Sequence, residues 1–382
     1  MAEIDLPGSG THRLRDPEPL ELPGTATAYR TVFAAAHVVA DPLGANAPGA
    51  PAAVDWDATL AFRHHVWSLG LGVADAMDTA QRGMGLDWDA TRQLITRSGA
   101  AARSVGGRLA CGVGTDQLAA PTATLPAILA AYEEQLDVVE AAGAQPILMA
   151  SRALAATAQS PDDYLRLYGQ LIGQARQPVV LHWLGEMFDP ALHGYWGSPD
   201  LDRATETVLA LIKEHAGRID GIKVSLLDAD REIALRRALP AGVKLYTGDD
   251  FNYPQLIRGD ELGHSHALLG IFDPIAATAA AALHALDAGD LARYDALLAP
   301  TLPLARHLFA TPTYHYKTGI VFIAWLAGHQ DHFTMVAGAQ SGRSVPHLVE
   351  LFRLADRAGV LPDPDLAVHR MRQFLAVAGV EA

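Results

Sequence analysis

Lys223 is the residue whose type and position point most directly to covalent chemistry. It closes a short apolar segment, 221–225, with the sequence Gly-Ile-Lys-Val-Ser. If this segment is a strand, alternation turns Ile222 and Val224 to one face and Lys223 to the other. An amine that faces the interior of a fold loses hydration, which lowers its pKa and favours the neutral amine that forms an imine. The alternative is a lysine that pairs with a neighbouring carboxylate and only stabilises the fold.

A second set of polar residues could bind a metal ion. The sequence His264-Ser265-His266 puts two imidazoles on one face of a strand, which is a spacing that metal sites use. His37 and Asp75 lie in other apolar segments and could join them. Against a metal, the sixteen histidines make chance pairs frequent, and no cysteine cluster or helical His-Glu motif accompanies the set. A divalent-metal site of His37, Asp75, His264 and His266 is therefore the alternative to an imine.

Aromatic and acidic residues near the ends of apolar segments could bind a substrate. Trp183, Phe188, Tyr195 and Trp196 lie in one Gly-containing stretch. Their rings suit stacking on the apolar face of a sugar, although packing on the rim of the fold is equally expected. The candidate substrate-binding residues are Asp78, Arg152, Trp183, Glu186, Asp249 and Asp250. The last two are more typical of carboxylates that cap a following helix.

The elements that must position these residues alternate in type along the chain. Apolar runs of strand character are separated by longer segments whose apolar residues recur at three and four. The eight runs are 31–39, 72–77, 108–113, 145–150, 178–182, 221–225, 243–247 and 267–272. Eight strand-helix repeats favour a closed (β/α)₈ TIM barrel over an open sheet, and in such barrels the reactive groups lie at the carboxyl ends of the strands.

The chain divides into three parts on this interpretation. Residues 1–29 mix proline, glycine and charge without periodicity, which indicates an extended N-terminal arm able to pack on a neighbouring molecule. Residues 30–287 form the catalytic barrel. Residues 288–382 contain four further helical patterns, which predict a C-terminal helical extension that covers one side of the barrel.

Composition excludes several classes of partner. The formal net charge of −14 and the lack of a basic stripe argue against nucleic acid. No apolar run reaches the length of a membrane span, and no export signal is visible. A single cysteine cannot form an internal disulfide, so we expect a cytoplasmic protein. No glycine-rich phosphate loop opens a helix, which leaves no case for a dinucleotide or ATP.

Two motifs in order resemble a known family. The Gly-Ile-Lys of 221–223, followed by Leu-Tyr-Thr-Gly-Asp-Asp at 245–250, is similar to the dihydrodipicolinate synthase and N-acetylneuraminate lyase family of class I aldolases and dehydratases. Weaker matches in the family's order extend along most of the chain, at 54–57, 70–86, 109–114, 177–181, 274, 289–290 and 316–319. The resemblance implies a (β/α)₈ barrel with a C-terminal helical extension, a small-molecule substrate, a homodimer or homotetramer, and an imine on Lys223 that requires no other cofactor.

The loop after the second strand departs from that family. Thr79 matches the first threonine of the family's Gly-Thr-Thr-Gly-Glu loop, which usually helps to relay a proton. The second threonine is Ala80 and the glutamate is Arg82 in this chain. The loop that normally receives the carboxylate of a 2-oxo acid has therefore changed, and we expect pyruvate to be a poor substrate.

The family's two tyrosine positions have changed as well. His182-Trp183 replaces the Tyr-Asn pair that closes the fifth strand, and Arg152 occupies the second tyrosine position. Because the unperturbed pKa of histidine lies near neutrality, we expect His182 to replace the missing acid and base. The segment 314–317, Tyr-His-Tyr-Lys, resembles a family position in the helical extension, so we expect a structural role for it and a place for its lysine away from the barrel mouth.

Three functions remain open at this point. The leading hypothesis is a lyase of the class I aldolase type, in which Lys223 forms an imine with a keto-sugar or related polar carbonyl compound and His182 and Thr79 move protons. The second is a sugar isomerase or hydrolase that depends on a divalent metal. The third is a barrel that binds a ligand without catalysis.

Overall fold

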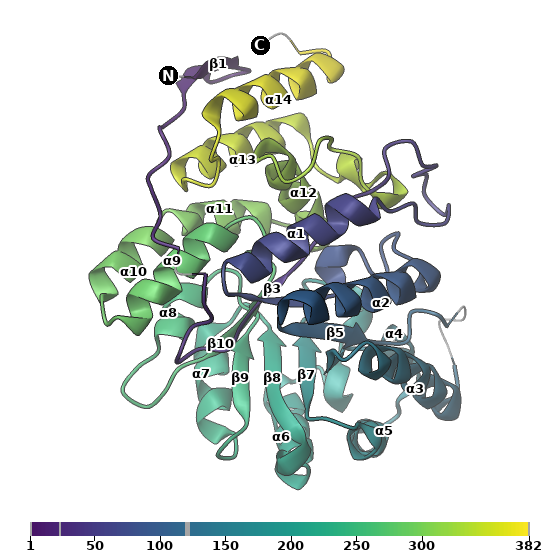
Figure 1. Ribbon diagram of the computed structural model, residues 1–382. Coiled ribbons are helices and arrows are strands. Elements are labelled where there is room, and N and C mark those ends of the chain that lie inside the picture. The colour runs from purple at the N-terminus through teal and green to yellow at the C-terminus, as the bar shows by residue number, and fades with distance from the viewer. Residues whose placement is uncertain (1, 23, 119–122, 381–382) are drawn as a thin grey trace.

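The computed structural model describes residues 2–22, 24–118 and 123–380, and its centre is a closed barrel of eight parallel strands (Figure 1). Each strand pairs with the next one in the chain, and β10 closes the barrel on β3 through Ala267 and Val32. The strands are β3 (Val32–Ala35), β4 (Gly72–Asp75), β5 (Leu109–Val113), β6 (Gln145–Leu148), β7 (Val179–Leu184), β8 (Ile219–Ser225), β9 (Lys244–Thr247) and β10 (His266–Leu269). The predicted (β/α)₈ barrel is confirmed.

Helices connect successive strands and surround the barrel (Figure 1). They begin where the sequence offers a cap: the carboxylates of Asp55 and Asp87, for example, accept hydrogen bonds from the first turns of α1 and α2. These helices are α1 (Trp56–Ser68), α2 (Trp88–Val105), α3 (Leu125–Ala141), α4 (Arg152–Thr157), α5 (Pro161–Gln174), α6 (Leu201–Glu214), α7 (Ala229–Ala238), α8 (Tyr253–Arg258) and α9 (Ala276–Asp287). Their caps and apolar faces hold the strands in register.

The interior of the barrel is filled by side chains and is not a pore. One inward-facing side chain from most strands contributes to a single buried cluster, which includes Phe33, Ala74, Ala110, Ile147, Val180, Tyr246 and Leu268. The cluster occupies the middle of the barrel. The cavities at the carboxyl ends of the strands therefore lie beyond it, and the larger of them has room for a small molecule.

The C-terminal extension packs around one fully buried helix. Every residue of α12 (Tyr316–Leu326) is buried, as expected for a helix that is apolar on all sides. The helices around it are α10 (Leu291–Leu298), α11 (Thr301–Leu308), α13 (Val345–Arg357) and α14 (Pro364–Val377). Within the described ranges, no helix combines the length and the apolar character that crossing a membrane requires. The start of α12 faces the carboxyl end of the barrel.

The N-terminal arm packs on the extension of its own chain. It folds into a hairpin of β1 (Glu3–Leu6) and β2 (Gly10–Arg13), and its buried Ile4 and Leu14 join the apolar core. The carboxylate of Asp356 in α13 accepts hydrogen bonds from the arm. Figure 1 accordingly shows both ends of the chain beside α14. The arm thus packs on the outer helices of the same molecule.

A histidine cluster between α1 and the end of α12 predicts loss of stability in acid. His329 packs on Phe62 and His65, with ring centres 5.3 and 4.5 Å away. Burial, with smaller contributions from neighbouring histidines, lowers the pKa of His329 to about 4. The unfolded chain therefore binds this proton more tightly, and stability present above pH 6.5 is lost as the pH falls toward 4. We expect the free energy of unfolding to fall by roughly 1–3 kcal/mol from this group over that interval.

The measurement is urea unfolding at pH 7 and pH 4.5 of the wild type and of the His329→Phe variant. The variant should lose less stability between the two pH values. His64→Gln, on the exposed face of α1, is the matched control and should follow the wild type. Equal losses in the wild type and in His329→Phe would contradict this explanation.

Candidate active site at the carboxyl end of the barrel

Lys223 lines a narrow cavity at the carboxyl end of the barrel. It lies on the inner face of β8 directly beside His182 of β7, and only 8% of it is exposed. Gly248 forms part of its surroundings: a Cβ atom there would lie 2.8 Å from Lys223 Cε and 2.2 Å from Ser225 Oγ. The bare backbone at Gly248 therefore leaves the lysine side chain the room that it needs. The polar side chains that share the cavity are Asp78, Thr79, Ser225, Asp250 and Tyr316.

The environment favours a neutral amine at Lys223. Burial lowers its pKa, and the nearby carboxylates of Asp250 and Asp78 oppose that effect without cancelling it. A lowered pKa makes the neutral amine, which is the form that attacks a carbonyl carbon, easier to reach. The structure thus places Lys223 at the barrel mouth, as predicted.

The two neighbouring aspartates after β9, Asp249 and Asp250, have different surroundings and hydrogen-bond partners. Asp250 lines the cavity, accepts a hydrogen bond from the backbone of Ile271 at 2.9 Å, and has its pKa raised to about 7 by burial. Asp249 instead accepts hydrogen bonds from the backbone N–H groups of Phe251 and Asn252 at 2.9 and 3.0 Å. Asp249 therefore caps the turn before α8, and Asp250 is the one in contact with the cavity.

A tyrosine from the C-terminal extension reaches the same cavity. The hydroxyls of Tyr316, at the start of α12, and Thr79, after β4, are 2.9 Å apart. The Tyr316 ring stacks on Phe309, with centres 4.5 Å apart, and Phe188 meets it edge-on. The segment 314–317 is therefore not away from the barrel mouth, since Tyr316 lines the cavity of Lys223.

Lys317 also lies at the site and not away from the barrel mouth. It is 5% exposed, and its Nζ donates a hydrogen bond to the carbonyl of Tyr314 at 3.1 Å and lies 4.5 Å from the centre of the Tyr316 ring. Burial lowers its pKa to about 8, against the attraction of Asp78. A second buried amine therefore lies against the ring of Tyr316, and any labelling experiment must distinguish it from the amine of Lys223.

His182 lies inside the barrel but beneath the cavity surface. It is fully buried beside Lys223, and its Nε2 is 3.3 Å from Ser225 Oγ. Its Nδ1 has no hydrogen-bond partner within the described part of the chain. Burial and the charge of Lys223 lower its pKa well below the usual value. An uncharged imidazole therefore supports the lysine from one side, and its predicted part in proton transfer stays a prediction.

A larger cavity of about 580 Å³ adjoins the first, and both are lined by Asp78 and Leu184. Its volume suits a small molecule. Arg152 lines it and pairs with Asp189, with Nε 2.5 Å from the carboxylate. Arg82 lines it too but is committed to the protein, because it pairs with Asp116 and donates to the carbonyl of Gly112 and the side chain of Gln135. Space for the rest of a substrate thus extends from Lys223 toward Arg152.

Of the four aromatic residues predicted to form a surface after the fifth strand, Phe188 lines the cavity of Lys223 and the other three are buried. Trp183 and Trp196 are 2% and 0% exposed, and Trp196 packs against Tyr164 and Tyr168 in the outer core. Trp183 follows the inward-facing His182, so alternation turns it toward the helices. Glu186 is exposed and pairs with a histidine on the same loop. Neither Trp183 nor Glu186 lines either of these two cavities, and burial of Trp183 excludes it from stacking on a ligand.

The four residues predicted to bind a metal are not brought together. His264 and His266 lie at the amino end of β10, where His266 Nδ1 accepts a hydrogen bond from the backbone before β3. His37 follows the carboxyl end of β3, at the opposite face of the barrel. The Asp75 carboxylate is bound by Arg63 at 2.8 Å. Across residues 2–22, 24–118 and 123–380, no group of three or more His, Cys, Asp or Glu side chains could hold a metal ion.

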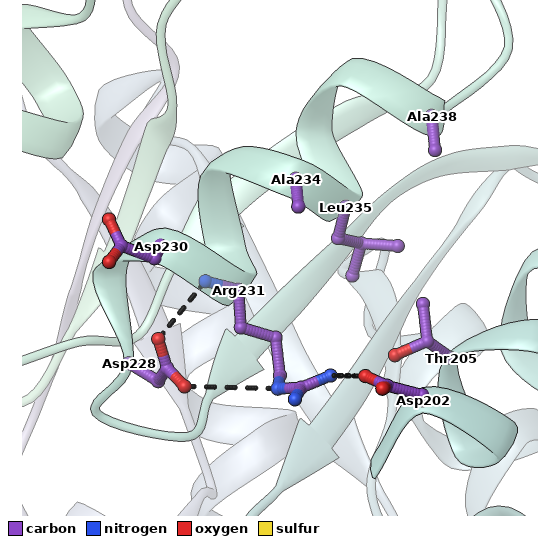
Figure 2. A pocket seen from close by; sticks show the side chains of 8 residues that line it. All are labelled: Asp202, Thr205, Asp228, Asp230, Arg231, Ala234, Leu235 and Ala238. Carbon is purple, nitrogen blue, oxygen red and sulfur yellow. Dashed lines mark hydrogen bonds and ion pairs between the residues drawn. The ribbon is translucent and has the colours of Figure 1, made fainter.

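A separate hollow on the outer surface lies between α6 and α7 and has no part in this site. Figure 2 shows Arg231 between two carboxylates, those of Asp228 and Asp202, and its Nη1 is 2.8 Å from Asp202. The remaining lining is a short polar and aliphatic helix surface. Arg231 is paired with these two carboxylates, and the exposed carboxylate of Asp230 lines the same hollow.

Comparison with solved structures shows which proteins share this fold. Dihydrodipicolinate synthase from Aquifex aeolicus matches with a TM-score of 0.66 and 12% identity, over 87% of this chain and 99% of that chain. YagE from E. coli K12, a prophage protein of the dihydrodipicolinic acid synthase family solved with pyruvate, matches with a TM-score of 0.67 and 14% identity, over 87% and 99%. The 4-hydroxy-tetrahydrodipicolinate synthase of Methylacidiphilum fumariolicum SolV matches with 0.64 and 14%, over 90% and 99%.

These structural matches confirm the predicted resemblance at the level of the fold. Among curated proteins, none matches this chain. A family model does match, over residues 6–380 and so over nearly the whole sequence. The chain therefore belongs to the family described as "Protein of unknown function (DUF993)", and it has the fold of the dihydrodipicolinate synthases.

Proposed function

We propose that this protein is a lyase of the class I aldolase type that forms an imine between Lys223 and a carbonyl substrate. The observation that carries the proposal is a buried lysine with a lowered pKa, which lines a cavity together with two carboxylates and a hydrogen-bonded Thr79–Tyr316 pair. This combination supplies a nucleophilic amine and groups that can move protons around it. No other cofactor is needed for the reaction proposed.

The chemistry follows from the properties of an imine. The neutral amine adds to the carbonyl carbon, and loss of water from that adduct leaves an iminium ion on Lys223. The iminium draws electrons from the adjacent carbon, so either a carbon–carbon bond or a carbon–oxygen bond next to it can break. Asp250, whose burial raises its pKa to about 7, can accept or donate a proton near neutral pH.

The charges around Lys223 favour a neutral, polyhydroxylated carbonyl compound such as a keto-sugar. Asp78 and Asp250 both act on the Lys223 amine electrostatically. Carboxylates accept hydrogen bonds from hydroxyl groups, and they repel the carboxylate of a 2-oxo acid such as pyruvate. With the tryptophans buried, this argument rests on the two aspartates and on the space toward Arg152. Assembly as a homodimer or homotetramer in the cytoplasm completes the proposal.

Borohydride trapping tests the proposal. The protein is incubated with dihydroxyacetone, with D-fructose or with pyruvate, reduced with sodium borohydride, and digested for mass spectrometry. We expect the neutral ketones to leave a reduced adduct on Lys223 and pyruvate to leave little. An adduct on Lys317 alone, or on neither lysine, would refute the imine, whereas efficient trapping of pyruvate alone would refute the substrate class.

A further inference from the structure

The cavity contains a phenol that no strand of the barrel supplies. Tyr316 belongs to α12, in the C-terminal extension, and its hydroxyl lies 2.9 Å from that of Thr79, which follows β4. Both residues line the cavity of Lys223. We propose that Tyr316 is the catalytic residue that donates a proton to, and takes a proton from, the substrate bound at Lys223. The inference rests on the function proposed above and deepens it.

The packing around Tyr316 fixes its hydroxyl in place. Phe309 stacks on its ring with an interplanar angle of 17°, and Phe188 makes an edge-to-face contact with it. Gly270 at the end of β10 leaves the necessary room, because a Cβ atom there would lie 3.3 Å from Tyr316 Cε2 and 3.6 Å from Thr79 Oγ1. A ring held by three neighbours and one hydrogen bond keeps its hydroxyl at one point, which is what efficient proton transfer requires.

The charges near Tyr316 suit a group that begins as a proton donor. Burial raises the pKa of Tyr316 well above its usual value, and Asp78 adds to this effect, so the phenol is protonated in the free protein. The phenolate becomes less costly once a positive iminium ion forms on Lys223. The ammonium group of Lys317, 4.5 Å from the centre of the ring, acts in the same direction.

Two proton transfers follow, and they balance. Attack of the Lys223 amine on the carbonyl gives a carbinolamine, whose hydroxyl takes the Tyr316 proton and leaves as water. The products are an iminium ion and a phenolate. The phenolate then removes a proton from the carbon beside the iminium, which gives a neutral enamine and restores the phenol. The same hydroxyl thus acts first as an acid and then as a base.

His182 is the other residue that sequence considerations put in this role, and its position is less suitable. Its imidazole lies in the barrel layer of Lys223, beneath the cavity, and its Nε2 faces Ser225 Oγ. The described side chains that line the cavity include Tyr316 and Thr79 but not His182. Of the two residues, Tyr316 is therefore the one that borders the space in which a substrate on Lys223 would lie.

Tyr316→Phe tests the inference, because phenylalanine keeps the ring and its packing. The assay follows exchange of the carbon-bound hydrogens of dihydroxyacetone for deuterium in D₂O by NMR, which reports enamine formation. We expect Tyr316→Phe to lower this rate by about 10²- to 10⁴-fold. The amount of borohydride-trapped adduct on Lys223 after long incubation should stay at the wild-type level, since the variant keeps the amine. Tyr314→Phe, two residues earlier, does not change a cavity-lining side chain and should exchange at the wild-type rate.

Each outcome decides between the alternatives. Unchanged exchange in Tyr316→Phe would overturn the inference, and so would loss of the trapped adduct in a variant that keeps the wild-type melting temperature, since that would show a role in binding. A wild type that forms no adduct would instead refute the proposed function. If Tyr316→Phe does not fold, Thr79→Val removes the partner of the phenol, and at least a 10-fold loss of exchange with a retained adduct is expected.

Discussion

Lys223→Arg is expected to lower hydrogen exchange on dihydroxyacetone by about 10³-fold or more and to abolish trapping at this position. Arginine carries the same positive charge near Asp78 and Asp250 as the protonated form of Lys223 does. The guanidinium group cannot lose its proton at any accessible pH, and it forms no imine under these conditions. The variant therefore separates the covalent role of the lysine from its charge. NMR exchange and mass spectrometry of the reduced protein measure the two effects.

Lys317→Arg is the matched control for this experiment. Lys317 is the second buried amine, against the ring of Tyr316, and its pKa, lowered to about 8, makes it the competing nucleophile. In Lys317→Arg the adduct on Lys223 should remain. If Lys223→Arg retained exchange and carried the adduct on Lys317, then Lys317 would be the lysine that forms the imine. The proposed role of Lys223 would be abandoned.

The fold could be predicted from the sequence because its signals are local. Each strand is a short apolar run, and each helix has its own periodicity and often a capping carboxylate, as Asp55 and Asp87 show. The position of Lys223 followed from the same local rule, since alternation along 221–225 fixes which side chains face inward. The general rule for barrels then put it with Asp78 and Asp250 at the carboxyl ends.

Alternation could have excluded some of the wrong predictions. If His182 faces the interior, its neighbour Trp183 must face the helices, and the structure buries Trp183 there. His264 and His266 precede most of the last apolar segment, so they belong to the amino end of that strand, away from His37. These mistakes came from treating residue types as candidates before asking to which face and which end each one belongs.

The parts of the site that come from the extension could not be derived in this way. Tyr316 follows Lys223 by about ninety residues, and only the packing of α12 against the barrel brings the two together. A signal did exist: the segment 318–326 carries no charged residue, which is typical of a helix buried on all sides. Polar side chains at the start of such a helix need polar surroundings, and an interior cavity provides them. Tyr316 and Lys317 are those side chains.

Asp250→Asn is expected to remove a step near pH 7 from the exchange rate and to lower the rate by about 10²-fold above that pH. Burial raises the pKa of Asp250 to about 7, so in the wild type its carboxylate accumulates above that value and can accept a proton within the cavity. Asparagine cannot titrate. Asp249→Asn is the neighbouring control: its side-chain oxygen can still accept the capping hydrogen bonds of Asp249, and the step near pH 7 should remain.

The same substitution should make the folded protein more stable in mild base, and this effect identifies the carboxylate as a costly buried charge. A folded pKa above the unfolded value of about 3.8 means that the folded state binds the proton more tightly, so the contribution of Asp250 to stability is present below pH 3.8 and is lost as the pH rises through 7. At pH 8 we therefore expect Asp250→Asn to raise the free energy of unfolding by roughly 1–3 kcal/mol. Urea unfolding at pH 8 and pH 5 measures the change, and the gain should shrink at the lower pH.

A variant that is slower and also more stable at pH 8 would show that this position is kept for reaction and not for folding. A variant less stable than the wild type at pH 8 would instead give Asp250 a structural role through its hydrogen bond to Ile271.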